Sequence, residues 1–141
     1  RLEAGLPLYG HDLDVETDPV SACLTFAISK KRREAGGYPG AERITELLAK
    51  GPPQRRIGLA LESRMAAREG SMVFAGDQPV GRVTSGGFAP TLGHPIAMAY
   101  VDAEHTGDGT QLEAEVRGKR LPARVVKMPF VPHRYHRKGD A

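Results

Sequence analysis

The stretch Gln54-Arg-Arg-Ile-Gly-Leu-Ala-Leu61 decides how most of this chain folds. Within it, Ile57, Leu59 and Leu61 alternate with other residues, which places the three large apolar side chains on one face. Arg56 lies on the opposite face. A period of two over this length predicts a β-strand that turns one face toward a core.

The same period returns in several short segments downstream. Further strands are predicted over 72–74, 80–83, 96–100, 112–116 and 121–125. The sequence between them is rich in glycine and proline, and Ser85-Gly-Gly87 is interpreted as one of the turns. Five or six short strands with such turns favour a small closed antiparallel barrel. Closure also removes exposed sheet edges.

The chain changes character at Gly51-Pro52-Pro53. Upstream of that point, an apolar stripe predicts a helix over 41–48, and a short apolar run at 26–28 fits a strand. This first section is too thin to bury a core by itself. The predicted fold class is therefore α+β, with a mixed helix and strand piece at 1–51 followed by a β-barrel at 52–141.

Three residues upstream predict a further helix. Asp18 and Pro19 fit an N-cap followed by proline at the first helical position, and Cys23 falls on the apolar face of that helix. We interpret Cys23 as a small core residue rather than a nucleophile. Asp12 and Asp14 are interpreted as an Asx-rich turn rather than an acid/base or metal motif.

Composition narrows the class of protein. The 141 residues carry 20 basic and 17 acidic side chains, mixed along the chain, with a net charge of +3. A nucleic-acid binder concentrates more positive charge on one element, so no nucleic-acid partner is predicted. Cys23 is the single cysteine, which excludes an intrachain disulfide. No apolar run is long enough to cross a bilayer, and no membrane partner is predicted.

Catalytic motifs are missing from the sequence. It contains neither a phosphate-binding loop of the Gly-x4-Gly-Lys-Ser/Thr type nor a Gly-x-Gly-x-x-Gly fingerprint. His133 and His136 could share a helix face, but no third ligand lies nearby in the sequence. We therefore predict no metal site and no catalytic residue.

A series of motifs nevertheless resembles one enzyme family, in the right order along the whole chain. They are Arg1-Leu-Glu-Ala-Gly-Leu-Pro-Leu-Tyr-Gly10, Lys30-Lys-Arg-Arg33, Tyr38-Pro-Gly-Ala41, Gln54-Arg-Arg-Ile-Gly58, Ala67-Arg-Glu-Gly70, Gly81-Arg-Val-Thr-Ser-Gly-Gly-Phe-Ala-Pro-Thr-Leu-Gly93, Pro95-Ile-Ala-Met-Ala99 and Lys127-Met-Pro-Phe-Val-Pro132. The set resembles the C-terminal part of the folate-dependent aminomethyltransferases, the T-proteins of the glycine cleavage system. The resemblance implies that residues 1–51 are an incomplete part of the folate-binding domain.

The resemblance implies an activity. T-proteins take the aminomethyl group carried on the lipoyl arm of the glycine cleavage H-protein and deliver its methylene to tetrahydrofolate. Ammonia and a reduced dihydrolipoyl arm are released. The catalytic aspartate of the family would lie upstream of Arg1, so the fragment would be inactive alone. The lipoylated H-protein and tetrahydrofolate are the implied partners.

Two folate contacts of the family map onto this sequence. Arg56 matches an arginine that helps to hold the folate, and Tyr135 matches a tyrosine near the C-terminus that also reaches it. A guanidinium can bind the glutamate carboxylate of folate through two charge-assisted hydrogen bonds. A tyrosine supplies an aromatic face with a polar tip. Phe26 stands where the family commonly has tryptophan, which removes an indole donor.

Two alternative functions stay open on the sequence. One is the homologous C-terminal folate domain of a dimethylglycine or sarcosine dehydrogenase, which a flavin-binding domain upstream in the gene would favour. The other is a stand-alone barrel that binds RNA or protein. The expected location is the bacterial cytoplasm, or the mitochondrial matrix if the source is eukaryotic.

Overall fold

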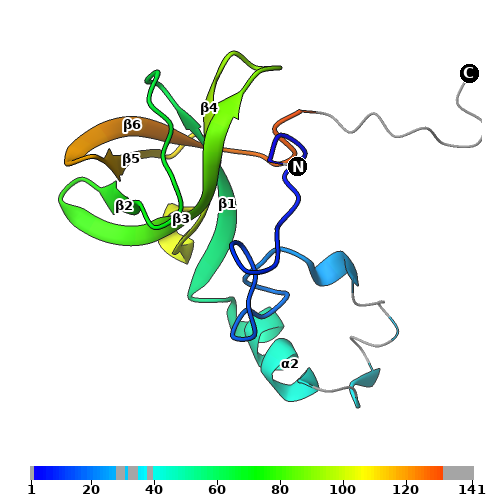
Figure 1. The fold of residues 1–141 in the computed structure, drawn as a ribbon. Helices are drawn as coiled ribbons and strands as arrows, with labels where there is room; N and C mark the ends of the chain where they lie inside the picture. Colours follow the sequence, from blue (N-terminus) through cyan, green and yellow to red (C-terminus); the bar gives the residue numbers. More distant parts are fainter. Residues whose placement is uncertain (1, 28–30, 32–34, 38–39, 132–141) are drawn as a thin grey trace, which may run out of the picture.

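The computed structural model describes residues 2–27, 31, 35–37 and 40–131, and it contains a closed antiparallel barrel (Figure 1). The strands are β1 (Gln54–Leu61), β2 (Met72–Ala75), β3 (Gln78–Ala89), β4 (His94–Asp102), β5 (Gln111–Val116) and β6 (Lys119–Val126). Their order around the barrel is β1-β4-β3-β2-β5-β6, and β6 pairs with β1 to close it. The short 3-10 helix η2 (Ala103–His105) follows β4. The predicted α+β class with a small closed barrel is confirmed.

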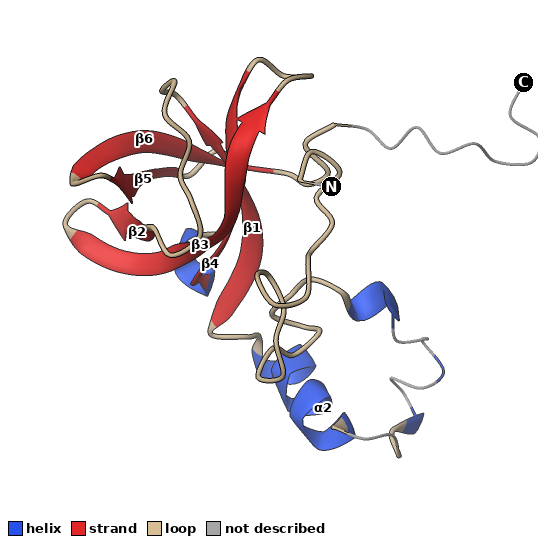
Figure 2. Cartoon of the chain, in the orientation of Figure 1, coloured by secondary structure: helices blue, strands red, loops and turns tan. Residues whose placement is uncertain are grey.

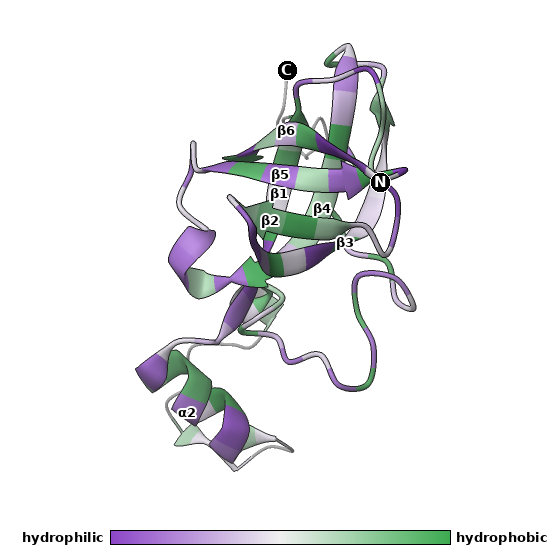
Figure 3. Cartoon of the chain, turned by 90° about the vertical axis from the view of Figure 1, so that its left-hand side faces the viewer, coloured by the Kyte–Doolittle hydropathy of each residue, from purple (hydrophilic) through white to green (hydrophobic). Residues whose placement is uncertain are grey.

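The barrel interior holds the core that the alternation in β1 predicts. Ile57, Leu59 and Leu61 belong to one buried cluster with valines and alanines from the other strands. Along β5, buried residues alternate with partly exposed ones, and Figure 3 shows the same alternation of hydrophobic and hydrophilic residues. The period of two is therefore that of strands with one face in a barrel core.

β1 differs from this simple pattern because its outer face is buried too. Every residue from 56 to 61 is buried. A Cβ added to Gly58 would lie 2.9 Å from the ring of Phe130, so the segment after β6 packs directly on this strand. That segment is bonded in turn to the start of the chain, since the N–H of Val131 donates to the carbonyl of Glu3 at 2.9 Å.

The predicted turn at Ser85-Gly-Gly87 is wrong, because these residues lie inside the long strand β3. Gly86 serves a close approach instead. A Cβ on Gly86 would lie 1.9 Å from the carbonyl oxygen of Ala67, so the loop between β1 and β2 passes against the strand backbone at this point.

The helix predicted from Asp18 is also wrong, and a series of turns replaces it. Asp18 does cap locally, since its Oδ1 accepts the N–H of Ser21 at 2.7 Å. Cys23 adopts φ 59°, in the left-handed region, which a continuous right-handed helix does not allow. Cys23 is exposed, so the prediction that it is a core residue is wrong as well.

The remaining upstream elements are helical (Figure 2). η1 (Thr25–Ala27) is a 3-10 helix where a strand was predicted, and the rest of that predicted strand lies outside the described residues. The predicted second helix is confirmed as α2 (Ala41–Lys50), which ends at Gly51 with φ 82°. Ile44 is its buried residue. The division of the chain at 51/52 stays a prediction.

Candidate functional site

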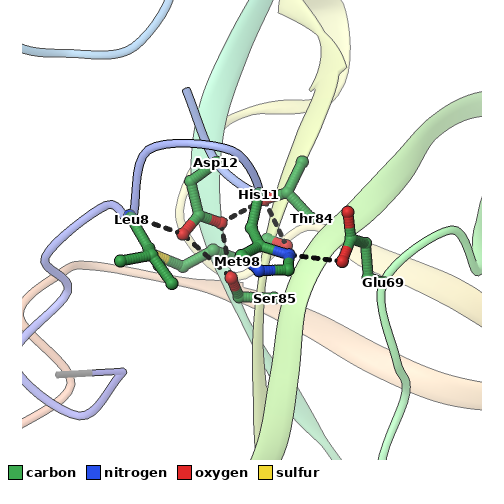
Figure 4. Close-up of polar contacts among 7 residues, drawn as sticks. All are labelled: Leu8, His11, Asp12, Glu69, Thr84, Ser85 and Met98. Atoms are coloured by element: carbon green, nitrogen blue, oxygen red, sulfur yellow. Dashed lines mark hydrogen bonds and ion pairs between the residues drawn. The ribbon is translucent and has the colours of Figure 1, made fainter. Parts of the chain in front are cut away.

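The opening segment, residues 2–24, is held against the outer face of the barrel by the carboxylate of Asp12 (Figure 4). Asp12 is 1% exposed. Its Oδ1 accepts hydrogen bonds from the hydroxyls of Thr84 at 2.5 Å and Ser85 at 2.7 Å. Its Oδ2 accepts the backbone N–H of Leu8 at 2.9 Å and also the Ser85 hydroxyl at 2.8 Å. A buried carboxylate is thus surrounded by donors, as its burial requires.

A β-bulge in β3 brings the two hydroxyls together. Val83 pairs with Ala99 and Ser85 pairs with Met98, so the register shifts across Thr84. In a regular strand, neighbouring side chains point to opposite faces. The bulge re-aims one of them, and both hydroxyls reach the same carboxylate.

The predicted Asx-rich turn is confirmed for Asp14 and incomplete for Asp12. The Oδ1 of Asp14 accepts the N–H of Glu16 and the hydroxyl of Thr17, both at 2.9 Å. The hydroxyl bond to Thr17 is the main reason that the pKa of Asp14 is lowered. Asp12 instead bonds to a strand 72 residues away. Sequence spacing could not show that partner.

A second, exposed contact joins the opening segment to the loop between β1 and β2. The Nδ1 of His11 lies 2.5 Å from the Oε2 of Glu69, and both side chains are about half exposed. An exposed pair of this kind contributes little to stability. It offers a useful comparison with the buried contact at Asp12, because both lie in the same segment.

Tyr100 ties the backbone of the segment to β4. Its hydroxyl donates to the carbonyl oxygen of Asp12 at 2.8 Å. Burial raises the pKa of Tyr100 to about 12, and the negative charge of Asp12 acts in the same direction, while Arg56 opposes both. The phenol therefore keeps its proton, and remains a hydrogen-bond donor, at pH values well above those at which a tyrosine usually ionises.

We expect Tyr100 to make folding sensitive to alkaline pH. An unfolded chain loses the phenol proton near pH 10, while the folded chain keeps it up to about pH 12. The folded state then holds one more proton, so the free energy of unfolding falls as the pH rises through this window. Tyr100→Phe should remove that fall, whereas Tyr9→Phe, at a site 68% exposed, should keep it. Urea titrations between pH 9 and 12 measure both, and parallel curves for the two variants would refute the assignment.

Arg56 is buried beneath the opening segment. Its side chain lies on the outer face of β1, as predicted, but the residue is 5% exposed. The Nε donates to the carbonyl of Ala22 and Nη1 to that of Gly5, both at 2.9 Å. The sulfur of Met98 lies 3.1 Å from Nη1, and that of Met128 lies 3.6 Å away. Arg56 therefore joins two distant parts of the opening segment to the barrel.

These contacts limit how Arg56 can meet a ligand. Burial lowers the pKa of Arg56, yet a guanidinium remains charged in proteins. Nε and one N–H of Nη1 are bonded to carbonyls, and the sulfur of Met98 lies against Nη1 as well. A two-bond pairing with a carboxylate would therefore displace either the Nε bond to Ala22 or the contact between Nη1 and Met98. Within the part of the chain that the structure describes, Nη2 donates to no protein atom, so its N–H groups are the donors of this guanidinium that the protein does not use. Tyr135 lies outside the described residues, as do His133 and His136.

A cavity of about 230 Å³ separates the turns of the opening segment from β3 and β4. Its walls include Asp14 and Asp18 on one side and Arg82 and Tyr100 on the other. Both carboxylates already accept hydrogen bonds from their own turns. Among the described residues, no three histidine, cysteine or acidic side chains converge as a metal site would require. In the same residues, no helix is long and apolar enough to cross a membrane.

Comparison with known proteins identifies a consistent set of relatives. Residues 54–132 match the family model of the glycine cleavage T-protein C-terminal barrel domain. The mitochondrial aminomethyltransferase of Dictyostelium discoideum is 46% identical over 138 residues, which cover 96% of this chain and 34% of that protein. The mitochondrial aminomethyltransferase of Gallus gallus is 46% identical over 136 residues, which cover 96% of this chain and 35% of that protein.

A solved structure agrees with these relatives. The crystal structure of the glycine cleavage system aminomethyltransferase T from Bartonella henselae matches with a TM-score of 0.92 and 41% identity. The match covers 97% of this chain and 38% of that chain. The similarity thus includes the opening segment as well as the barrel, while the chain spans about a third of the length of the curated relatives it matches.

Proposed function

Because this chain belongs to the glycine cleavage T-protein family, we propose that it forms the C-terminal part of a tetrahydrofolate-dependent aminomethyltransferase. In the proposed reaction, the aminomethyl group on the lipoyl arm of the H-protein gives its methylene to tetrahydrofolate. Ammonia leaves, and the arm is released as dihydrolipoyl. The lipoylated H-protein and tetrahydrofolate are accordingly the proposed partners.

One observation carries this proposal. The chain matches named aminomethyltransferases at about 45% identity over nearly its whole length, so both the opening segment and the barrel are shared with them. The contacts of Asp12 and Arg56 show that these two parts pack as one unit. The mitochondrial relatives support the mitochondrial matrix as the location for a eukaryotic source. For a bacterial source we propose the cytoplasm.

The activity is tested on the complete gene product that contains this chain. Aminomethylated H-protein and tetrahydrofolate are supplied together, and the release of ammonia is measured. We expect ammonia to appear faster with tetrahydrofolate than without it. Equal rates of ammonia release with and without tetrahydrofolate would overturn the proposed reaction. If the complete gene product contains flavin and turns over dimethylglycine or sarcosine, the alternative function as a dimethylglycine or sarcosine dehydrogenase is supported instead.

We propose that Arg56 and Tyr135 contribute to holding the folate. For Arg56, the support is a charged guanidinium that two backbone carbonyls hold through Nε and Nη1, while Nη2 is not used by these bonds. A single charge-assisted hydrogen bond from Nη2 to a folate carboxylate is compatible with this geometry. For Tyr135, the support is the family resemblance.

Replacing Arg56 should weaken folate binding. We expect Arg56→Ala in the complete protein to raise the Kd for tetrahydrofolate by about tenfold or more, since a hydrogen bond to a charged group is lost. Calorimetry measures the Kd, and thermal unfolding shows whether the barrel is intact. Arg55→Ala is the matched control, because the neighbouring arginine is exposed. Equal affinities for the Arg56 variant and wild type would remove Arg56 from the site.

A further inference from the structure

We propose that Asp12 is a positioning residue for the folate site, which acts by fixing the opening segment that orients the guanidinium of Arg56. This inference rests on the proposed function and deepens it.

The first step is the anchor itself. The carboxylate of Asp12 bonds two side-chain hydroxyls on the β3 bulge and the backbone N–H of Leu8. Tyr100 bonds the backbone carbonyl of the same residue. Because Asp12 is 1% exposed, water cannot readily replace these donors. Residues 8–12 are therefore fixed on the barrel through both the side chain and the backbone carbonyl of Asp12.

The second step leads from this anchor to Arg56. Leu6 and Pro7 link Leu8 to Gly5, and the proline ring fixes one backbone angle of this short connection. The N–H of Gly5 is bonded to the carbonyl of Leu2 at 2.9 Å, which closes a turn at that point. A displacement of Leu8 is thus transmitted to Gly5 through few flexible bonds.

The third step is the contact with the guanidinium. The carbonyl of Gly5 accepts Nη1 of Arg56 at 2.9 Å. A Cβ on Gly5 would lie 2.9 Å from the Cβ of Met128, so the turn is packed tightly against the methionine whose sulfur lies 3.6 Å from Nη1 of Arg56. Moving Gly5 would rotate the guanidinium and with it Nη2. Small displacements of a binding group reduce affinity strongly because hydrogen bonds depend on direction.

The test measures folate binding and folding separately in the complete protein. Asp12→Asn keeps the shape of the side chain but replaces one acceptor oxygen with a donor. We expect the Kd for tetrahydrofolate to rise by about tenfold through loss of positioning. Glu69→Gln is the matched control, because it alters the exposed contact of the same segment at His11. Its Kd should equal that of wild type.

A purely structural role would not produce the expected pattern. If Asp12→Asn lowers the melting temperature but leaves the Kd unchanged, the inference is overturned. Should that variant not fold, Ser85→Ala removes one donor and leaves the carboxylate in place, and the same Kd comparison applies. A double-mutant cycle with Arg56→Lys tests the route: non-additive effects on the Kd support action through Arg56, and additive effects overturn it.

The failure of this inference can be told from the failure of the proposed function. If wild type does not bind tetrahydrofolate, the proposed function fails. If wild type binds and Asp12→Asn binds equally well, the proposed function stands and the positioning role of Asp12 is refuted.

Discussion

Gly86→Ala should destabilise the protein by about 3 kcal/mol or more, since overpacking against a rigid neighbour is among the most costly single changes. The added Cβ would lie 1.9 Å from the carbonyl oxygen of Ala67 and 2.8 Å from its carbonyl carbon. Both are backbone atoms of a residue that is 0% exposed. Neither can move aside as a flexible side chain would, so the strand or the loop must shift.

The neighbouring glycine provides the control. A Cβ on Gly87 would meet its nearest neighbour, the Cδ2 atom of Leu2, at 3.9 Å, an ordinary contact distance. Gly87→Ala should therefore be neutral or stabilise slightly, because alanine restricts the unfolded chain. Equilibrium unfolding in urea compares the two variants. Equal stabilities would show that the loop does not press on β3 at Gly86.

Leu59→Ala should cost about 3 kcal/mol, in the range for removing a large buried aliphatic side chain. Leu59 is 0% exposed and sits in the barrel core. The strand around it is buried on both faces, so its backbone cannot collapse easily into the space left behind. The expected loss therefore contains both a transfer contribution and a cavity contribution.

The control for this change is a leucine outside the barrel. Leu48 lies on α2 and is 44% exposed. Leu48→Ala should alter the free energy of unfolding by about 0.5 kcal/mol or less. Urea unfolding with circular dichroism measures both variants. A loss at Leu59 no larger than that at Leu48 would contradict the assignment of this strand to the core.

The barrel could be predicted because its signals are local. Alternation at Ile57, Leu59 and Leu61 reports directly which side chains face a core. Glycine and proline between the strands mark most of the turns. The exception was Ser85-Gly-Gly87, where glycine permits the close passage of Ala67 rather than a turn. Local sequence does not distinguish these two uses of glycine.

The site could be predicted only in part. The opposite-face position of Arg56 follows from the alternation, whereas its burial depends on Gly5, Ala22 and Met128, which are far away in the sequence. The anchor at Asp12 was missed for the same reason. Two adjacent hydroxyls at Thr84 and Ser85 were the available signal, and their meaning depends on a bulge that sequence spacing does not reveal.

The sequence by itself determined the family, the barrel class and the side of β1 on which Arg56 lies. It did so because strand periodicity and motif order are properties of neighbouring residues. Only the tertiary structure decided that the opening segment is an irregular cover held by Asp12, and that Arg56 is enclosed beneath it. Those outcomes depend on two hydrogen bonds between distant parts of the sequence. Arg56 and Gly5 are 51 positions apart, and Thr84 and Asp12 are 72 positions apart. Such bonds form only once the barrel has brought its outer face and the opening segment together.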